Sequence, residues 1–123
     1  MDDDVVDRIS AAVEVELGAH LHDTRGLAIA NAISAVEHGV RRLDASLGGL
    51  GGCPFAPGAT GNVPIENLAH AFSHMGIRTG LDLAALISAA ELACRLVNRP
   101  VSSHVGIAGP RFADVGPDRG EAT

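Results

Sequence analysis

A strand–helix–strand pattern near the start of the chain most constrains what it can fold into. Residues 19–22 alternate apolar and polar side chains, as a short strand does, and residues 40–46 have the character of a second strand. Between them lies a helix predicted from an apolar stripe. Two strands joined this way run parallel with a right-handed crossover, so the sequence predicts an α/β fold. The predicted stripe consists of Ile29, Ile33, Val36 and Val40.

Helices are predicted on both sides of this unit. Apolar residues at helical spacing over residues 5–13 indicate a first helix, which Gly18 separates from the strand. A helix from about Pro64 to Met75 follows a glycine-rich loop over residues 47–62 and ends at Gly76. The next helix is expected to be capped by Thr79, with Asp82 three residues on, and to stop before Pro100. Its predicted buried stripe is Leu83, Leu86, Ile87, Ala90, Cys94 and Val97.

Two parallel strands do not make a complete sheet. They leave unpaired edges, and parallel sheets normally bury both faces. We therefore expect residues 1–108 to be part of a larger α/β protein, or to be completed by a partner chain or by self-association. Residues 109–123, rich in glycine, proline and charge, are expected to form a flexible tail.

Composition excludes several classes of function. The formal net charge is −6, and the only aromatic residues are three phenylalanines, which disfavours nucleic-acid binding. No apolar run is long enough to cross a bilayer, and the acidic start is opposite in charge to a signal peptide. Two cysteines are too few for a disulfide framework. These features favour a soluble cytoplasmic protein without a membrane partner.

His20 and His22 are the sharpest chemical feature. Residues two apart on a strand point to the same face, so their imidazoles can converge on one ion. Zinc, manganese or iron would suit two imidazoles, and oxygen ligands would shift the preference toward Mn²⁺ or Mg²⁺. The alternative is a pair of histidines in ordinary hydrogen bonds. Their position favours a site, because α/β folds bind ligands at the carboxyl ends of their strands. The other histidines, which lack a partner at ligand spacing, are expected to be surface or structural: His38, His70, His74 and His104.

The glycine-rich loop leaves the second strand at that same edge. It lacks the ending of a phosphate-binding P-loop and the spacing of a dinucleotide fingerprint. We interpret it as a mobile lid, with Gly51 and Gly52 as hinges beside Cys53. A lone cysteine in a loop is usually inert, but a metal and a helix N-terminus would favour its thiolate. Cys94 falls on an apolar stripe and is expected in the core.

Two polar residues near this edge have two interpretations each. Asn62 is a turn or cap residue, or its amide oxygen reaches a metal. Asp23 caps the following helix, or orients a metal ligand. Glu66 lies in the first turn of its helix, where the favourable interaction with the helix dipole is sufficient to explain a glutamate. The residues alone leave the alternatives for Asn62 and Asp23 open.

The chain also resembles hydroxymethylglutaryl-CoA lyases over nearly all of its length before the tail. His20-Leu21-His22-Asp23-Thr24 is similar to the His-x-His-Asp-Thr segment of that family. The His-x-His segment is shared with synthases that run Claisen condensations, but the Gly-Gly-Cys-Pro sequence points to the lyases. The other matching segments are Gly48 to Ala56, Gly58 to Asn62, Met75-Gly76-Ile77, Thr79 to Leu83 and Asn98 to Ser103.

This resemblance implies a fold, a reaction and a site. The family fold is a TIM (β/α)8 barrel, of which this chain would hold the last two strands. The implied reaction cleaves 3-hydroxy-3-methylglutaryl-CoA to acetyl-CoA and acetoacetate, with Mg²⁺ or Mn²⁺ as cofactor. The resemblance makes His20, His22 and Asn62 metal ligands, Cys53 the catalytic cysteine of the lid, and His20 a proton shuttle. Glu66 matches an acidic residue near the site, and Asp23, Gly51 and Gly52 belong to the matching motifs.

The chain also departs from the family pattern. Arg25 stands where many members have Tyr, and Asn67 where many have Asp. The first barrel strand, which carries an Arg-Asp pair with a metal-binding Asp, has no counterpart in the chain. The implied alternatives are an inactive piece, a subunit of a split enzyme that needs a complementing N-terminal barrel chain, and a related acyl-CoA lyase or Claisen-type synthase. A homo-oligomer is the other expected assembly.

Overall fold

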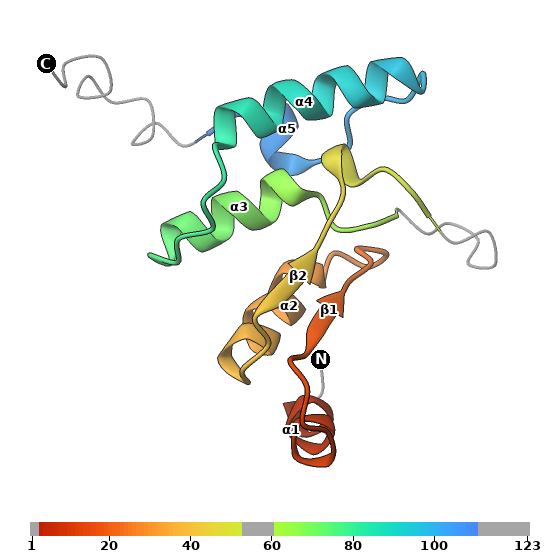
Figure 1. Ribbon diagram of the computed structural model, residues 1–123. Coiled ribbons are helices and arrows are strands. Elements are labelled where there is room, and N and C mark those ends of the chain that lie inside the picture. Colours follow the sequence, from red (N-terminus) through yellow and green to blue (C-terminus); the bar gives the residue numbers. More distant parts are fainter. Residues whose placement is uncertain (1–2, 53–60, 111–123) are drawn as a thin grey trace, which may run out of the picture.

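The computed structural model describes residues 3–52 and 61–110 (Figure 1). The hypotheses about Cys53, and the tail beyond residue 110, fall outside these residues. In chain order the elements are helix α1 (Asp3–Ala12), strand β1 (Gly18–His20), helix α2 (Ala28–Glu37), strand β2 (Arg42–Asp44), a 3-10 turn η1 (Leu47–Gly49), and helices α3 (Ile65–His74), α4 (Leu83–Leu96) and α5 (His104–Ala108).

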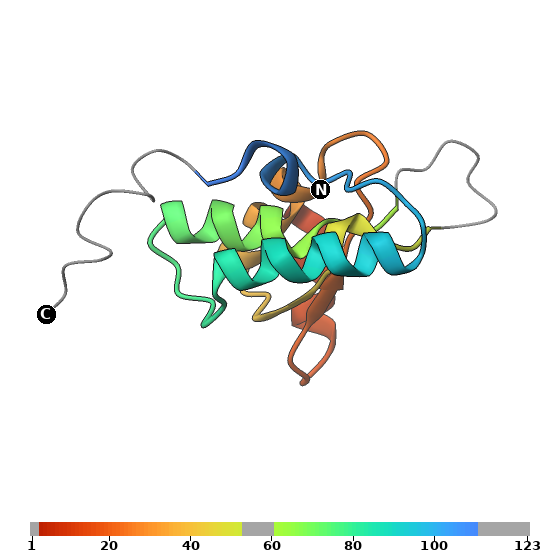
Figure 2. The ribbon, with the colours of Figure 1, turned by 90° about the horizontal axis from the view of Figure 1, so that it is seen from above.

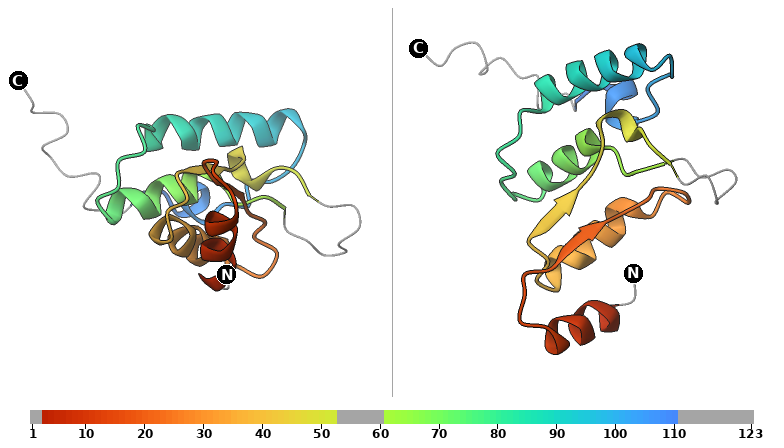
Figure 3. Two further views of the ribbon diagram at one scale, coloured as in Figure 1. Left: turned by 60° about the horizontal axis from the view of Figure 1, so that its bottom comes forward. Right: turned by 45° about the vertical axis from the view of Figure 1, so that its right-hand side comes forward.

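The two strands pair in parallel, which confirms the predicted strand–helix–strand unit (Figure 3). Their register joins Gly18 to Arg42, Ala19 to Leu43 and His20 to Asp44. Both strands are shorter than the sequence predicted. The reason is that, beyond His20 and Asp44, residues 61–64 lie between the segments that continue from β1 and β2.

At Val63 the inserted segment is hydrogen-bonded to the backbone on both of its sides. The N–H of Val63 donates to the Leu21 carbonyl at 3.0 Å, and its carbonyl accepts from the Ser46 N–H at 3.1 Å. Isolated bridges pair His22 with Asn62 and Ser46 with Pro64 on either side of it. The Val63 side chain is completely buried. We call residues 61–64 the bridging segment, because they are hydrogen-bonded to the ends of both strands.

Helix α2 packs through small residues instead of the predicted stripe. Ala28, Ala32 and Ala35 are completely buried, whereas the predicted Ile29, Ile33 and Val36 are only half-buried. Alanine lets the helix approach its neighbours closely, and the larger side chains lie at the margins of the cores. Val40 is buried, as predicted.

Helices α3 and α4 lie side by side and run in opposite directions (Figure 2). The boundaries of α3 agree with the prediction, but the predicted cap of α4 is wrong. Asp82, and not Thr79, is the N-cap: its side chain accepts from the Ala85 N–H at 3.0 Å. The predicted stripe of α4 is buried only at Ala90 and Cys94, because the helix is covered on one side only.

Helix α5 was not predicted, and it lies outside what periodicity can detect because it has only five residues. Ser103 caps it, accepting from the Gly106 N–H at 3.0 Å. Asn67 of α3 ties it down by accepting from the Val105 N–H at 3.0 Å. His104 lies 3.4 Å from the Asn67 amide nitrogen, in agreement with a structural role for that histidine.

Several large apolar side chains are exposed on the outside of this arrangement. Leu96 is 77% exposed and Val97 54% exposed at the end of α4, and Ile107 of α5 is also exposed. A groove of about 360 Å³ lies between β2, α3 and the segment after α3, lined mainly by apolar side chains. Among the described residues no helix is long and apolar enough to cross a membrane.

Candidate metal centre

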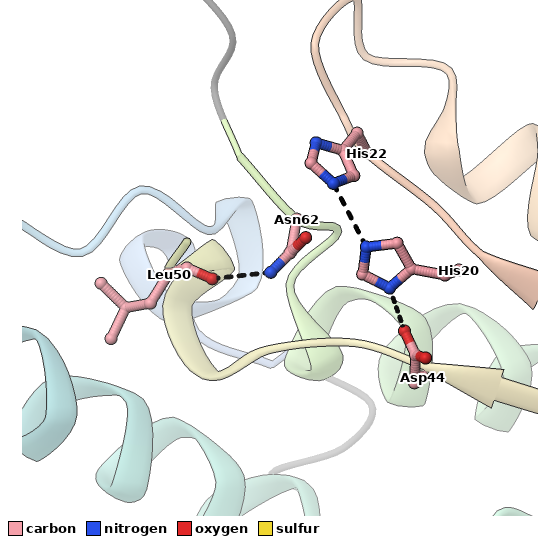
Figure 4. A network of polar contacts seen from close by, with 5 residues as sticks. All are labelled: His20, His22, Asp44, Leu50 and Asn62. Atoms are coloured by element: carbon pink, nitrogen blue, oxygen red, sulfur yellow. Dashed lines mark hydrogen bonds and ion pairs between the residues drawn. The ribbon is translucent and has the colours of Figure 1, made fainter. Parts of the chain in front are cut away.

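The two predicted histidines lie together at the carboxyl end of β1 (Figure 4). Their Nε2 atoms are 3.2 Å apart, and the ring centroids are 5.1 Å apart in an edge-to-face arrangement. The strand geometry explains this, since residues two apart share a face. The bridge between His22 and Asn62 then fixes the backbone at the second histidine.

Asn62 reaches the same place from the bridging segment. Its Nδ2 donates to the Leu50 carbonyl at 3.0 Å. With the amide nitrogen engaged, Oδ1 lies on the side of the amide that faces the imidazoles (Figure 4). Three residues separated by as many as 42 positions in sequence are thereby gathered at one edge: His20, His22 and Asn62.

A fourth polar residue, Asp44, was missed by the sequence interpretation. It ends β2, is the register partner of His20, and its carboxylate contacts the His20 Nδ1 atom (Figure 4). A signal for it existed in the chain. The carboxyl ends of neighbouring parallel strands meet at one edge, so a carboxylate near the end of the second strand is a candidate partner for a histidine near the end of the first.

Asp23 performs the capping role that the sequence left open. Its Oδ1 accepts from the Ala28 N–H, at the first residue of α2, at 3.0 Å. The residue at the backbone N-cap position, Leu27, offers no side-chain cap. Asp23 therefore secures the turn that connects the histidines to α2.

Glu66 has a structural role beyond its favourable interaction with the helix dipole. Its side chain is completely buried. Both carboxylate oxygens accept from the Gly48 N–H, at 3.0 and 3.2 Å. This bond ties the first turn of α3 to η1, where the glycine-rich loop begins.

Gly48 is held from three sides. Besides the Glu66 bond, its carbonyl accepts from the Ser102 hydroxyl at 2.9 Å. A Cβ added to it would lie 2.6 Å from the sulfur of Cys94, which is itself buried, as predicted. The first residues of the predicted lid over residues 47–62 are therefore fixed to α3, α4 and the segment before α5, in contrast to the mobility that the sequence predicted for them.

Gly51 shows the same close packing beside the site. Its φ of 104° is one that other residues rarely adopt, and an added Cβ would lie 2.6 Å from the Asn62 Nδ2 atom. Gly52, the second predicted hinge, has open space around it. Glycine at position 51 thus allows the loop backbone to lie directly against Asn62.

The donor atoms suit a divalent cation in part. Two ligands at about 2.1 Å from an octahedral ion, at right angles, lie about 3.0 Å apart, which is close to the 3.2 Å between the Nε2 atoms. The amide oxygen adds a hard donor suited to Mg²⁺ or Mn²⁺. Across residues 3–52 and 61–110, no three histidine, cysteine, aspartate or glutamate side chains form a group that could hold a metal ion. What the described residues bring to this edge is thus two imidazole nitrogens and one amide oxygen.

Comparison with known proteins gives consistent matches. The HMGL-like family model matches residues 3–93. The (R)-citramalyl-CoA lyase of Chloroflexus aurantiacus is 46% identical over 111 residues, covering 90% of this chain and 34% of its own length. The human mitochondrial hydroxymethylglutaryl-CoA lyase is 45% identical over 103 residues, covering 80% and 32%.

A solved structure agrees with these matches. An HMG-CoA lyase from Acinetobacter baumannii, in complex with coenzyme A and 3-methylmalate, superimposes with a TM-score of 0.82 and 40% identity, covering 89% of this chain and 36% of that one. The chain therefore spans about a third of the length of the relatives it matches. Together with the His-x-His and glycine-rich motifs, these matches show that the chain belongs to the HMGL-like family, the family of the HMG-CoA lyases.

Proposed function

We propose that this chain supplies the metal-binding carboxyl edge of an acyl-CoA lyase that cleaves 3-hydroxy-3-methylglutaryl-CoA to acetyl-CoA and acetoacetate. The observation that carries the proposal is the convergence of two imidazoles, 3.2 Å apart at their Nε2 atoms, beside the amide of Asn62. Family membership supports the reaction class, since the relatives are lyases of branched acyl-CoA compounds by name.

His20, His22 and Asn62 would hold the divalent cation, Mg²⁺ or Mn²⁺. The bound cation would act as a Lewis acid toward the hydroxyl and carboxylate oxygens of the substrate. Two hydrogen bonds support the assignment, because each engages the side-chain nitrogen that would not bind the cation. His20 Nδ1 bonds to Asp44, and Asn62 Nδ2 donates to the Leu50 carbonyl. Ligands of metal sites are commonly oriented by such bonds.

The proton transfers fall to His20 and Cys53. Removal of the substrate hydroxyl proton forms the ketone of acetoacetate, and the electron pair of the broken carbon–carbon bond moves to the acetyl-CoA enolate, which then takes up a proton. His20 would carry a proton to or from these atoms. Cys53 would be the catalytic cysteine of the loop, and Gly51 and Gly52 would let that loop approach the substrate.

The rest of the barrel must come from outside residues 3–110. We propose six further strands, from the same or a complementing chain, with a homo-oligomer as the alternative assembly. Three features support this: two strands with free edges, the apolar groove beside β2, and Ser46. Within the described residues the buried Ser46 hydroxyl has no hydrogen-bond partner, whereas buried hydroxyls usually have one. We place the assembled enzyme in the cytoplasm.

A second candidate reaction is the cleavage of (R)-citramalyl-CoA. The observation that favours it is the 46% identity to the Chloroflexus enzyme over 90% of this chain. That match is as strong as the matches to hydroxymethylglutaryl-CoA lyases. Both substrates are branched 3-hydroxyacyl-CoA compounds, so the same metal-binding edge would serve either.

The test uses the chain alone and the chain co-expressed with the N-terminal two thirds of the Acinetobacter lyase. Mn²⁺ binding is followed by electron paramagnetic resonance, and consumption of the two acyl-CoA substrates by chromatography. We expect Mn²⁺ binding that is lost in His20→Ala and kept in His70→Ala, a histidine on α3. Turnover is expected in the co-expressed assembly. Absence of Mn²⁺ binding in both preparations, or equal binding by the two variants, would overturn the proposal.

A further inference from the structure

We infer that Asp44 is a positioning residue for the metal-binding face of His20. It holds the His20 ring with Nδ1–H turned toward β2, and so leaves the Nε2 lone pair directed at the cation. This inference rests on the proposed function, because it assigns a role to a residue beside the proposed metal ligands.

The strand register, and not a chance side-chain conformation, brings the two residues together. His20 and Asp44 are the last paired residues of β1 and β2, and they face each other in the parallel ladder. Neighbouring side chains in register point to the same face of a sheet. Any assembly that keeps this register keeps the carboxylate next to the ring.

The chemistry of the pair then selects one tautomer. An ionised carboxylate can only accept hydrogen bonds, so the ring nitrogen that faces it must carry the proton. In neutral His20 this leaves Nε2 unprotonated, and Nε2 is the atom that lies 3.2 Å from His22. Only an unprotonated nitrogen binds a metal, and the bond made by one ring nitrogen decides which form the other takes.

Asn62 is fixed in a comparable way. Its Nδ2 is engaged by the Leu50 carbonyl, which leaves the oxygen on the side of the histidines. In two of the three proposed ligands, His20 and Asn62, a neighbouring residue therefore engages the atom that does not bind the cation. The contact of Asp44 with His20 is part of this pattern.

Stability does not explain Asp44. The His20 side chain is 53% exposed and that of Asp44 is 70% exposed. Exposed ion pairs contribute little to folding. The same strand offers a matched control, because Arg42 makes another exposed ion pair, with Glu16 at 3.0 Å. Loss of either ion pair should leave the fold intact, but only loss of the Asp44–His20 pair should change the tautomer of His20.

The experiment measures tautomers and metal affinity in the ¹⁵N-labelled full chain at about pH 8, where ordinary histidines are neutral. Long-range ¹H–¹⁵N correlation spectra identify the protonated nitrogen of His20 without metal, and Mn²⁺ titration gives the Kd. We expect Nδ1–H in the unaltered chain. Asp44→Ala should convert His20 largely to Nε2–H and raise the Kd about tenfold or more. Asp44→Asn, whose amide oxygen still accepts, should rescue most of both effects, and Arg42→Ala should change neither.

The inference is overturned if Asp44→Ala leaves the His20 proton on Nδ1, or leaves the Kd within about twofold of the original while the tautomer changes. Asp44→Val, which suits a strand and has no polar atom, takes the place of Asp44→Ala if that variant does not fold. If the unaltered chain alone binds no Mn²⁺, the titration is repeated on the co-expressed assembly, and absence of binding there as well would refute the proposed function instead. The tautomer spectra would still decide the role of Asp44 in that case.

Discussion

The carboxyl edge of the sheet and the outer surface of the molecule differ in how fully their groups are engaged. At the carboxyl edge, Gly48 is held through its N–H and its carbonyl, and Cys94 lies so close that an added Cβ would be 2.6 Å from its sulfur. On the outside, the end of α4 exposes Leu96 and Val97, and one edge of β2 borders an apolar groove. The difference indicates that the proposed site is built by contacts within the described residues, whereas the outer surface leaves apolar side chains exposed to solvent. Four substitutions test this contrast, and they are ordered from the largest expected loss of stability to the smallest.

The largest loss is expected for Gly48→Ala. Gly48 has a φ of 61°, and its new Cβ would lie 2.6 Å from the Cys94 sulfur. Left-handed backbone strain and overpacking together should lower the free energy of unfolding by about 3 kcal/mol. Denaturant unfolding followed by circular dichroism measures the change. Gly52→Ala, where the added methyl meets open space, is the control; equal losses in the two variants would contradict a tightly held turn.

Glu66→Ala comes next. It leaves the Gly48 N–H without its buried acceptor, which should cost about 2 kcal/mol of unfolding free energy. Glu66→Gln should cost less, because its amide oxygen can still accept. The same unfolding measurement applies, with Glu91→Ala on the exposed side of α4 as the control, expected within about 0.5 kcal/mol. A Glu66→Ala variant as stable as Glu91→Ala would show that this bond does not anchor the loop.

Asp82→Ala should have a smaller effect. Removing the side chain that accepts from the Ala85 N–H should lower stability by about 1 kcal/mol, the usual value for an N-cap. Thr79→Ala is the matched control, because the Thr79 hydroxyl accepts from the exposed Leu81 N–H, at 3.3 Å, and not from a first-turn N–H of α4. Thermal melts of both variants distinguish the observed cap from the predicted one. A larger loss in Thr79→Ala would restore the capping box.

The smallest change in stability is expected for Leu96→Gln, within about 0.5 kcal/mol, because Leu96 is 77% exposed. The same substitution should reduce self-association, since it removes apolar surface from the open side of α4. Sedimentation velocity measures the shift toward monomer. Gln substitution at the exposed Leu27 at the start of α2 is the control. An unaltered chain that is already monomeric would contradict the view that this surface needs cover.

The sequence predicted the strand–helix–strand unit and the shared face of His20 and His22, because both follow from periodicity along one segment. It did not predict the contact of Asp44 with His20. That contact depends on the register between strands, which periodicity within a strand does not contain. The alanine face of α2 was missed for a similar reason: which side of an apolar helix is buried depends on the layers around it.

Helix caps and short helices were also not predictable from local sequence patterns. Thr79 and Asp82 are both good N-cap residues, and tertiary packing selected Asp82. Helix α5 is held by Asn67, which accepts from the N–H of Val105, 38 positions further along the chain, and no local pattern encodes that bond. The residues alone left open whether Asn62 joins the histidines, and only the family resemblance favoured it, since the grouping depends on a loop returning to the sheet.

The bridging segment has a consequence for assembly. Because Val63 is bonded to the backbone at the ends of both strands, β1 and β2 cannot spread apart at the carboxyl edge without breaking those bonds. The backbone spacing between His22 and Asn62 is thus set by bonds within the described residues. In the proposed barrel, the further strands would meet a half-site already organised, and would need to contribute only the other ligands and walls.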